Sequence, residues 1–142
     1  MSGDDRKKVI FICTHNSARS QMAEGILKNL YGDRFEVYSA GTEPSRVNPY
    51  AIRAMEEIGI DISGHSSKAI EKFRGKEFDY VITLCGEADE VCPTFPGGDR
   101  NRLHRGFPDP SQFRGKDEEI LAGFRTVRDE IRTWLESEFE KN

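Results

Sequence analysis

Hydrophobic residues along this chain fall into two recurring patterns, which are short apolar runs and longer stretches with helical spacing. The apolar runs predict buried strands at 9–12 and 80–84, alternating apolar and polar residues predict a strand at 35–39, and a further short strand is expected near Leu103. Apolar positions three and four residues apart predict helices at 22–30, 49–58 and from about Asp117 onward, with a shorter helix at 66–73. Strands that alternate with helices predict the α/β class, with a small four-stranded parallel sheet and helices on both faces.

Length and composition narrow the class of protein further. The 142 residues suit a single domain over 1–142, and a net charge of −4 argues against non-specific binding to nucleic acid. No apolar run has the length that a bilayer requires, and the polar segment 1–8 is unlike a signal peptide. We therefore expect a cytoplasmic monomer with neither nucleic acid nor a membrane as its partner.

The segment that joins the first predicted strand to the first predicted helix carries the clearest chemistry. Cys13 ends the strand, and Arg19 follows six residues later where the helix begins. Backbone N–H groups at a helix N-terminus attract a tetrahedral anion, and a guanidinium binds two of its oxygens at once. We therefore expect an anion loop over 13–20. Its substrate-binding residues are expected to be Thr14, His15, Asn16, Ser17, Ala18, Arg19 and Ser20.

Cys13 is the candidate nucleophile of this loop. The positive field of the helix N-terminus and of Arg19 is expected to lower the pKa of Cys13 and favour the thiolate. The Ser20 hydroxyl is placed to donate a hydrogen bond to that thiolate. The alternative is a structural cysteine, since a free thiol packs well at the end of a buried strand.

Two more cysteines suggest a relay of thiols. Cys85 ends the predicted strand 80–84, so it is expected at the same sheet edge as Cys13. Seven residues of straight helix rise by roughly 10 Å, whereas the Cα atoms of a disulfide lie roughly 4.4–6.8 Å apart. Cys85 and Cys92 therefore bond only if the segment between them unwinds. In a relay, Cys13 attacks an oxyanion, Cys85 attacks Cys13, and Cys92 attacks Cys85.

Other roles for the thiols are less well supported by the sequence. Three cysteines without a signal peptide argue against a framework of structural disulfides. A metal site on all three thiols lacks an evident fourth ligand, so no metal is predicted. Two unrelated buried thiols at Cys85 and Cys92 remain the alternative to the redox pair.

A carboxyl group between two prolines is the candidate general acid. Pro108 and Pro110 stiffen the backbone on either side of Asp109, which can then be aimed at the anion site. To donate a proton the carboxyl must be protonated, so its pKa is expected to be raised by burial or by the bound anion. The alternative is an ordinary Asp-Pro turn.

These motifs together resemble those of the thioredoxin-coupled arsenate reductases, which share the fold of the low-molecular-weight protein tyrosine phosphatases. The matching segments cover nearly the whole chain and are 13–25, 39–42, 59–63, 81–85, 92–93, 109–110 and 127–131. The resemblance implies that Cys13 attacks arsenic while Arg19 and the loop N–H groups hold the arsenate oxygens. It also implies that Asp109 protonates the departing hydroxyl.

The resemblance assigns the later steps to the other two thiols. Cys85 would attack Cys13 and release arsenite, which leaves a Cys13–Cys85 disulfide. Cys92 would then form the final Cys85–Cys92 disulfide on a looped-out segment. Reduced thioredoxin would reset the enzyme as an external reductant, and no bound cofactor is expected.

The chain departs from many relatives at three positions. His15 stands in place of a glycine and Ala18 in place of a second loop cysteine. If position 15 requires a positive φ, histidine adopts it with some strain, and its ring can touch the substrate or a neighbour. Lys68 stands where relatives with a potassium site beside the loop have an acidic ligand. Its ammonium can replace that cation beside Asn16, Glu24 and Ser39, so no potassium is predicted.

Two alternatives to the reductase are kept. A protein tyrosine phosphatase would use the same Cys13, Arg19 and Asp109, because phosphate and arsenate are close in size and charge. It has no need of the Cys85 and Cys92 pair, and Ser111 follows the Asp-Pro motif where such phosphatases tend to have aromatic residues. The other alternative is a thiol sensor or anion-binding module without turnover.

Overall fold

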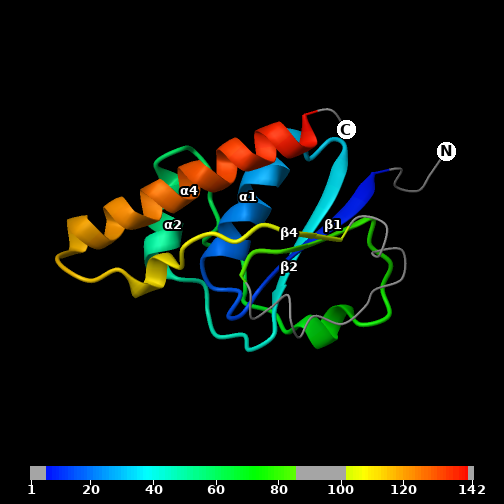
Figure 1. Cartoon of the computed structure of the whole chain (residues 1–142), viewed down its shortest axis with the longest axis horizontal. Helices are drawn as coiled ribbons and strands as arrows, with labels where there is room; N and C mark the ends of the chain where they lie inside the picture. Colours follow the sequence, from blue (N-terminus) through cyan, green and yellow to red (C-terminus); the bar gives the residue numbers. More distant parts are fainter. Residues whose placement is uncertain (1–5, 86–101, 141–142) are drawn as a thin grey trace.

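The computed structural model describes residues 6–85 and 102–140, so Cys92 and the rest of 86–101 lie outside the described residues. Four strands form one parallel sheet in the order β2-β1-β3-β4 (Figure 1). The strands are β1 (Lys7–Cys13), β2 (Phe35–Gly41), β3 (Tyr80–Thr83) and β4 (Arg102–His104). All four lie where the sequence predicts them, including the short strand at Leu103.

In the ranges that the structure describes, three α-helices and two short 3-10 helices accompany the sheet. They are α1 (Arg19–Tyr31), α2 (Pro49–Glu56), α4 (Asp117–Phe139), η1 (Ile70–Phe73) and η3 (Pro110–Gln112). The start of α2 follows from its sequence, because the Asn48 side chain accepts a hydrogen bond from the Tyr50 N–H at 2.8 Å and proline occupies the first helical position. No helix in the described part of the chain has the length and apolar character needed to span a membrane.

The predicted helix at 66–73 is wrong over its first half. Only Ile70–Phe73 is helical, and as a 3-10 turn. Ser66, Ser67 and Lys68 instead direct backbone or side-chain hydrogen bonds at the anion loop and at α1. Those bonds tie this stretch to the loop, where it has no regular secondary structure, and Ala69 forms an isolated bridge with Gly41.

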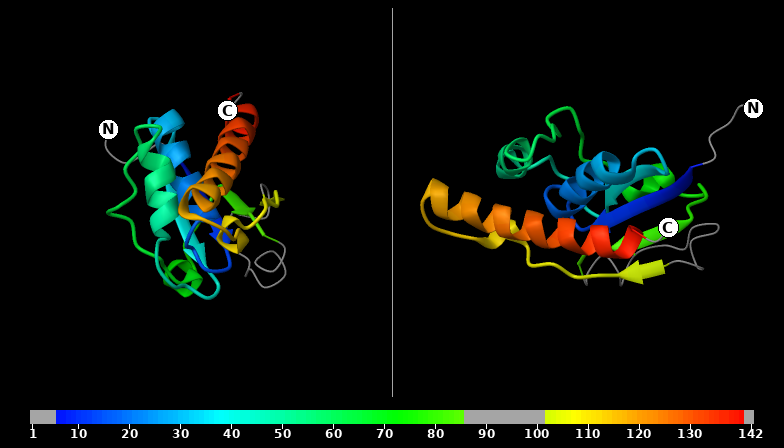
Figure 2. Two further views of the ribbon diagram at one scale, coloured as in Figure 1. Left: turned by 90° about the vertical axis from the view of Figure 1, so that its left-hand side faces the viewer. Right: turned by 90° about the horizontal axis from the view of Figure 1, so that it is seen from above.

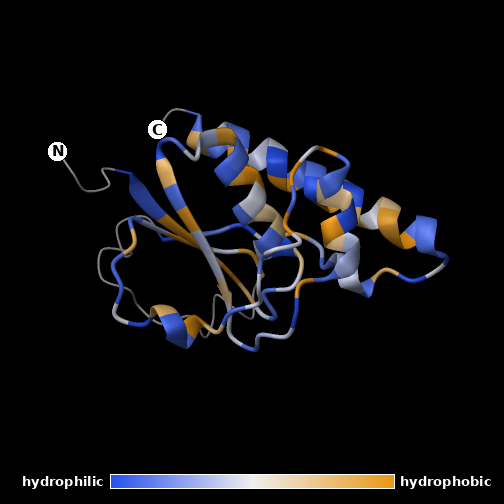
Figure 3. Cartoon of the chain, turned by 180° about the vertical axis from the view of Figure 1, so that it is seen from behind, coloured by the Kyte–Doolittle hydropathy of each residue, from blue (hydrophilic) through white to orange (hydrophobic). Residues whose placement is uncertain are grey.

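Alternating residues of β1 face two separate cores. Val9 and Phe11 pack with the three α-helices, which gather on one face of the sheet (Figure 2). Ile10 and Ile12 pack on the other face with Phe73 and the segment around it. Helices therefore cover both faces, as predicted, although the described cover of the second face is the short η1. Coloured by hydropathy, the helices alternate between hydrophobic and hydrophilic residues along their length (Figure 3).

Candidate active site

The anion loop runs from the end of β1 to the start of α1. No side chain caps the N-terminus of α1, so its first N–H groups stay available to the loop. The Ser20 N–H donates a hydrogen bond to the Cys13 sulfur, whereas the Ser20 hydroxyl accepts one from Asn16 Nδ2 at 2.8 Å. The contact to the thiol that sequence reasoning assigned to the Ser20 hydroxyl is thus made by the backbone of Ser20.

The loop reverses direction at Asn16 and not at His15. Asn16 has a φ of 50° and is the one residue other than glycine with a positive φ in the described chain. Asparagine enters this region more readily than most residues, so the strain expected for His15 does not arise. The His15 ring touches a neighbour instead, with Nδ1 donating to the Glu43 carbonyl at 2.9 Å.

Cys13 and Cys85 meet at the carboxyl edge of the sheet, which confirms the expected proximity. They end the neighbouring strands β1 and β3, and both side chains are buried. The two thiols are hydrogen-bonded to each other. Cys85 Sγ also lies 3.2 Å from the hydroxyl of Thr14 in the anion loop. Two nucleophilic sulfurs are therefore in contact at the base of the loop.

The pKa of Cys13 is shifted in the direction opposite to the prediction. The hydrogen bond with Cys85 and the burial of the thiol raise the pKa well above its ordinary value. The charge of Arg19 and the Ser20 N–H lower the pKa, but these effects are smaller. In the free protein Cys13 is therefore held as a thiol.

Arg19 has one buried donor that the described residues leave unsatisfied. Its Nη1 donates to the Phe107 carbonyl at 3.1 Å, and its Nη2 lies 3.6 Å from Asp109 Oδ2. Its Nε is buried and has no hydrogen-bond partner among the described residues. An unpaired buried N–H is unfavourable, and an oxygen of a bound anion is the natural acceptor for it.

A cavity of about 200 Å³ opens over these groups. It is lined by Cys13, His15, Ser17, Ala18, Arg19, Ser45, Asp109 and Ser111. The volume suits a small inorganic anion, and the lining is mostly small and polar. None of the lining residues is aromatic apart from the imidazole of His15.

Asp109 lies in this cavity as an ionised carboxylate. Burial raises the pKa of Asp109, but the hydrogen bonds from the Ser111 hydroxyl and N–H and the charge of Arg19 together lower it below its ordinary value. The expected rise in the pKa of Asp109 is therefore wrong for the free protein. The carboxylate caps η3 and pairs with the same arginine that an oxyanion would use.

Comparisons with known proteins agree with this geometry. The family model for low molecular weight phosphotyrosine protein phosphatases matches residues 8–141. The chain belongs to that family. An arsenate reductase of Halalkalibacterium halodurans is 52% identical over 127 residues, which are 89% of this chain and 91% of that protein.

Solved structures that this chain resembles include arsenate reductases. One in its oxidized state has a TM-score of 0.78 and 41% identity, and the match covers 92% of this chain and 95% of that one. The thioredoxin-dependent arsenate reductase of Corynebacterium glutamicum has a TM-score of 0.67 and 30% identity, covering 99% of this chain and 66% of that one.

In this member of the phosphatase family the predicted loop residues divide into two groups. His15, Ser17, Ala18 and Arg19 line the cavity, whereas the side chains of the other three are bonded elsewhere. Those three are Thr14, which contacts Cys85, and Asn16 and Ser20, which bond to each other.

Sequence reasoning missed two of the residues that line the cavity. Ser111 follows the Asp-Pro motif directly, and an acidic residue two positions before a serine is a recognisable turn signal. Ser45 is brought in by hydrogen bonds between the segment after β2 and the anion loop, including its own N–H to the His15 carbonyl at 3.1 Å. No local pattern around Ser45 indicates that contact.

Proposed function

We propose that this chain reduces arsenate to arsenite in arsenic detoxification, using its thiols as the reductant and thioredoxin to restore them. The observation that carries the proposal is the contact between Cys13 and Cys85 beneath an anion-sized cavity. A phosphatase needs one thiol, whereas a reductase needs a second within reach of the first. The arsenate reductases among the relatives support the same assignment.

The first step joins arsenate to Cys13. Arg19 and the loop N–H groups hold the oxygens, and the incoming anion displaces Asp109 from Arg19. The freed carboxylate then takes the Cys13 proton as the sulfur attacks arsenic. Asp109 returns this proton to the departing hydroxyl, which leaves as water. A Cys13–arsenic(V) bond results, with no change in oxidation state.

The second step moves two electrons. Cys85 gives its proton to an oxygen on arsenic and attacks the Cys13 sulfur, and the electron pair of the sulfur–arsenic bond stays on arsenic. Arsenite leaves and a Cys13–Cys85 disulfide forms. Cys92, outside the described residues, then attacks Cys85 and frees Cys13. Reduced thioredoxin cleaves the Cys85–Cys92 disulfide, and no bound cofactor takes part.

The proposed cellular location and partners follow from this thiol chemistry. We propose that the chain works as a single-domain monomer in the cytoplasm, where thioredoxin is kept reduced. Its substrate is a free oxyanion, and neither nucleic acid nor a membrane takes part.

The deciding experiment follows arsenate-dependent NADPH oxidation in the presence of thioredoxin and thioredoxin reductase. We expect turnover by the wild type and near-total loss in Cys85→Ser and in Cys92→Ser. No arsenate turnover, with steady cleavage of para-nitrophenyl phosphate by all three proteins, would establish the phosphatase instead. Oxidation of the thiols without turnover of either substrate would identify a sensor.

A further inference from the structure

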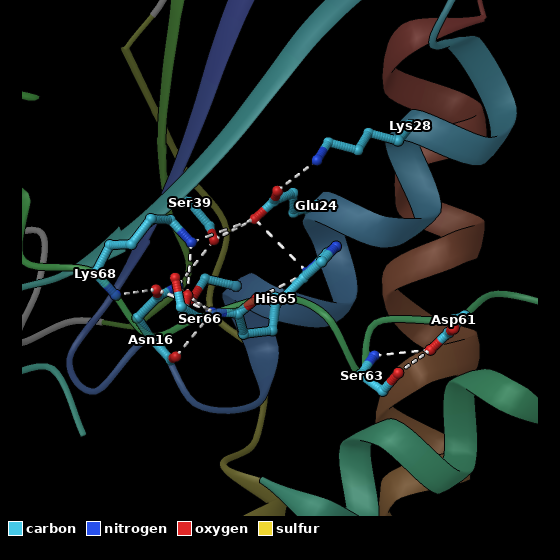
Figure 4. Close-up of polar contacts among 11 residues, drawn as sticks. Asn16, Glu24, Lys28, Ser39, Asp61, Ser63, His65, Ser66 and Lys68 are labelled. Carbon is cyan, nitrogen blue, oxygen red and sulfur yellow. Dashed lines mark hydrogen bonds and ion pairs between the residues drawn. The ribbon is translucent and has the colours of Figure 1, made fainter. Parts of the chain in front are cut away.

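A buried carboxylate lies directly behind the anion loop. Glu24 on α1 is 5% exposed, and its two oxygens have different partners (Figure 4). Oε2 accepts a hydrogen bond from Lys28 Nζ at 2.7 Å, and Oε1 accepts one from the Ser39 hydroxyl at 2.5 Å. Lys68 Nζ and His65 Nδ1 each lie 4.0 Å from Oε1. Side chains from α1, from β2 and from the segment 65–68 thus meet at one negative charge.

Lys68 is the cation of this group that is held inside the protein. Its side chain is 16% exposed, against 47% for that of Lys28. Burial lowers the pKa of Lys68, and the Glu24 carboxylate opposes that effect. The Lys68 ammonium donates to the Ser66 carbonyl at 2.7 Å, so it lies between a carbonyl oxygen and a carboxylate. Without a cation between them, the Ser66 carbonyl oxygen and the Glu24 carboxylate would repel each other.

The hydrogen bonds around Lys68 converge on Asn16. The Lys68 N–H donates to Asn16 Oδ1 at 2.8 Å. The Ser66 carbonyl that binds the ammonium also accepts from Gln21 Nε2, which in turn donates to the Asn16 carbonyl at 3.1 Å. On the other side, Asn16 Nδ2 donates to the Ser39 hydroxyl, which donates to Glu24.

Asn16 is the residue that gives the anion loop its shape. It is fully buried, and its φ of 50° lies in the left-handed region, which is the conformation that builds an anion-binding nest of backbone N–H groups. A loop that binds a tetrahedral anion requires those groups to be fixed before the anion arrives. The conformation of Asn16 is therefore a direct determinant of anion affinity.

We propose that Lys68 is a positioning residue for oxyanion binding, acting as a built-in cation that neutralises Glu24 and fixes Asn16 through the 66–68 segment. This inference rests on the proposed function, since it names the part of the molecule that prepares the same anion site. Lys68 does not touch the substrate. His65 has a separate task, because its Nδ1 donates to Gln21 Oε1 at 3.0 Å and orients that amide.

The test compares three lysines, each replaced by methionine to keep the length of the side chain. The readout is the affinity for inorganic phosphate, measured by calorimetry without turnover. We expect Lys68→Met to bind phosphate about tenfold more weakly, because small displacements of a preorganised site are costly. Lys72→Met, at an exposed position on η1, serves as the matched control and should bind as the wild type does. Lys28→Met, which removes the exposed partner of Glu24, should weaken binding less than Lys68→Met.

Chemical rescue separates a fixed cation from a merely structural side chain. In Lys68→Ala, ammonium or methylammonium chloride should restore phosphate affinity, whereas sodium chloride at equal ionic strength should not. In turnover assays the same salts should lower the raised KM for arsenate with little change in kcat. A small ammonium ion can re-enter between Glu24 and the Ser66 carbonyl, but it cannot repair lost packing.

Phosphate affinity in Lys68→Met equal to that of the wild type would overturn the proposal. A weakened Lys68→Ala that no small ammonium ion restores would overturn it as well. If Lys68→Met does not fold, Lys68→Arg takes its place, and it should bind phosphate within about threefold of the wild type. A Lys68→Arg variant that is folded but tenfold weaker would also contradict it. Failure of the proposed function would be seen separately, as a wild type that binds phosphate but does not reduce arsenate.

Discussion

The two sides of the anion loop differ in how completely their polar groups are bonded. On the cavity side, Arg19 has one hydrogen bond, to the Phe107 carbonyl, a 3.6 Å approach to Asp109, and a buried Nε without a partner among the described residues. On the far side, the amide nitrogen and both oxygens of Asn16 are hydrogen-bonded. The difference indicates that the two sides have separate roles. The bonded groups fix the shape of the loop, and the unbonded donors are free to bind the anion.

This comparison predicts that substitutions on the two sides will separate activity from stability. On the cavity side, a change should remove activity with little effect on folding, since the lost group was poorly bonded in the free protein. On the far side, a change should lower stability and anion affinity together.

The largest effect is expected at Arg19. Arg19→Lys should lower kcat/KM for arsenate by about 10²–10³-fold, because an ammonium cannot bind two oxygens as the guanidinium fork does. The free energy of unfolding should stay within about 1 kcal/mol of the wild type, since one hydrogen bond to Phe107 is lost and one unpaired donor is removed. Steady-state kinetics and urea unfolding check the two parts. An Arg19→Lys variant whose free energy of unfolding is several kcal/mol below that of the wild type would contradict the predicted separation of activity from stability.

Asp109 should give effects of opposite sign on binding and turnover. Asp109→Asn should lower kcat by about a hundredfold, because the proton donor is lost. The same variant should bind phosphate about threefold more tightly, since the carboxylate no longer competes for Arg19. The gain should persist down to about pH 5, because the lowered pKa keeps wild-type Asp109 ionised over that range. Weaker phosphate binding by Asp109→Asn in calorimetry would argue against the competition.

Gly41, at the end of β2, tests the far side through backbone packing. A Cβ there would lie 2.7 Å from the Thr14 carbonyl and 2.9 Å from the Asn16 nitrogen. Gly41→Ala should therefore lower the free energy of unfolding by about 1–3 kcal/mol and weaken phosphate binding about tenfold. Gly64→Ala is the control, because nothing lies within 4 Å of its Cβ position. Equal phosphate affinity in both alanine variants would contradict this prediction, because the loop could then shift without losing anion affinity.

The sequence predicts the framework of the site better than its electrostatics. The strands, the helix after the loop and the contact of Cys13 with Cys85 follow from local patterns and from the geometry of parallel sheets. The direction of the pKa shift of Cys13 does not follow from local patterns, because it depends on burial and on the thiol of Cys85, 72 residues away. The ionised state of Asp109 likewise depends on hydrogen bonds from Ser111 and on the distance to Arg19.

The back of the loop shows a different limit of sequence reasoning. Ser66, Ser67 and Lys68 precede an apolar pair with helical spacing, so the pattern favours a helix there. They bond instead to a loop some fifty residues earlier and have no regular secondary structure. Helical propensity is a weak preference, and several tertiary hydrogen bonds override it.

The smallest effect is expected at an ion cluster remote from the loop, where α2 meets α4. Hydrogen bonds from Arg125 and Arg128 lower the pKa of Glu57 to about 2, against an ordinary value of 4.5. A carboxyl whose pKa is lowered by folding stabilises the protein above its ordinary pKa, and this stabilisation is lost as the pH falls through the folded value. Glu57→Gln should therefore be less stable than the wild type at pH 7, and the difference should shrink between pH 4.5 and about 2.

The magnitude at Glu57 should be small and sensitive to salt, because the Glu57 and Arg125 side chains are 37% and 35% exposed. Urea unfolding at pH 7, 4 and 3 measures the difference, with Glu56→Gln as the neighbouring exposed control. Phosphate affinity at pH 7 should not change in either variant. If Glu57→Gln weakened phosphate binding as much as Gly41→Ala does, a loss of stability remote from the loop would be enough to lower anion affinity. The proposed difference between the two sides of the loop would then be wrong.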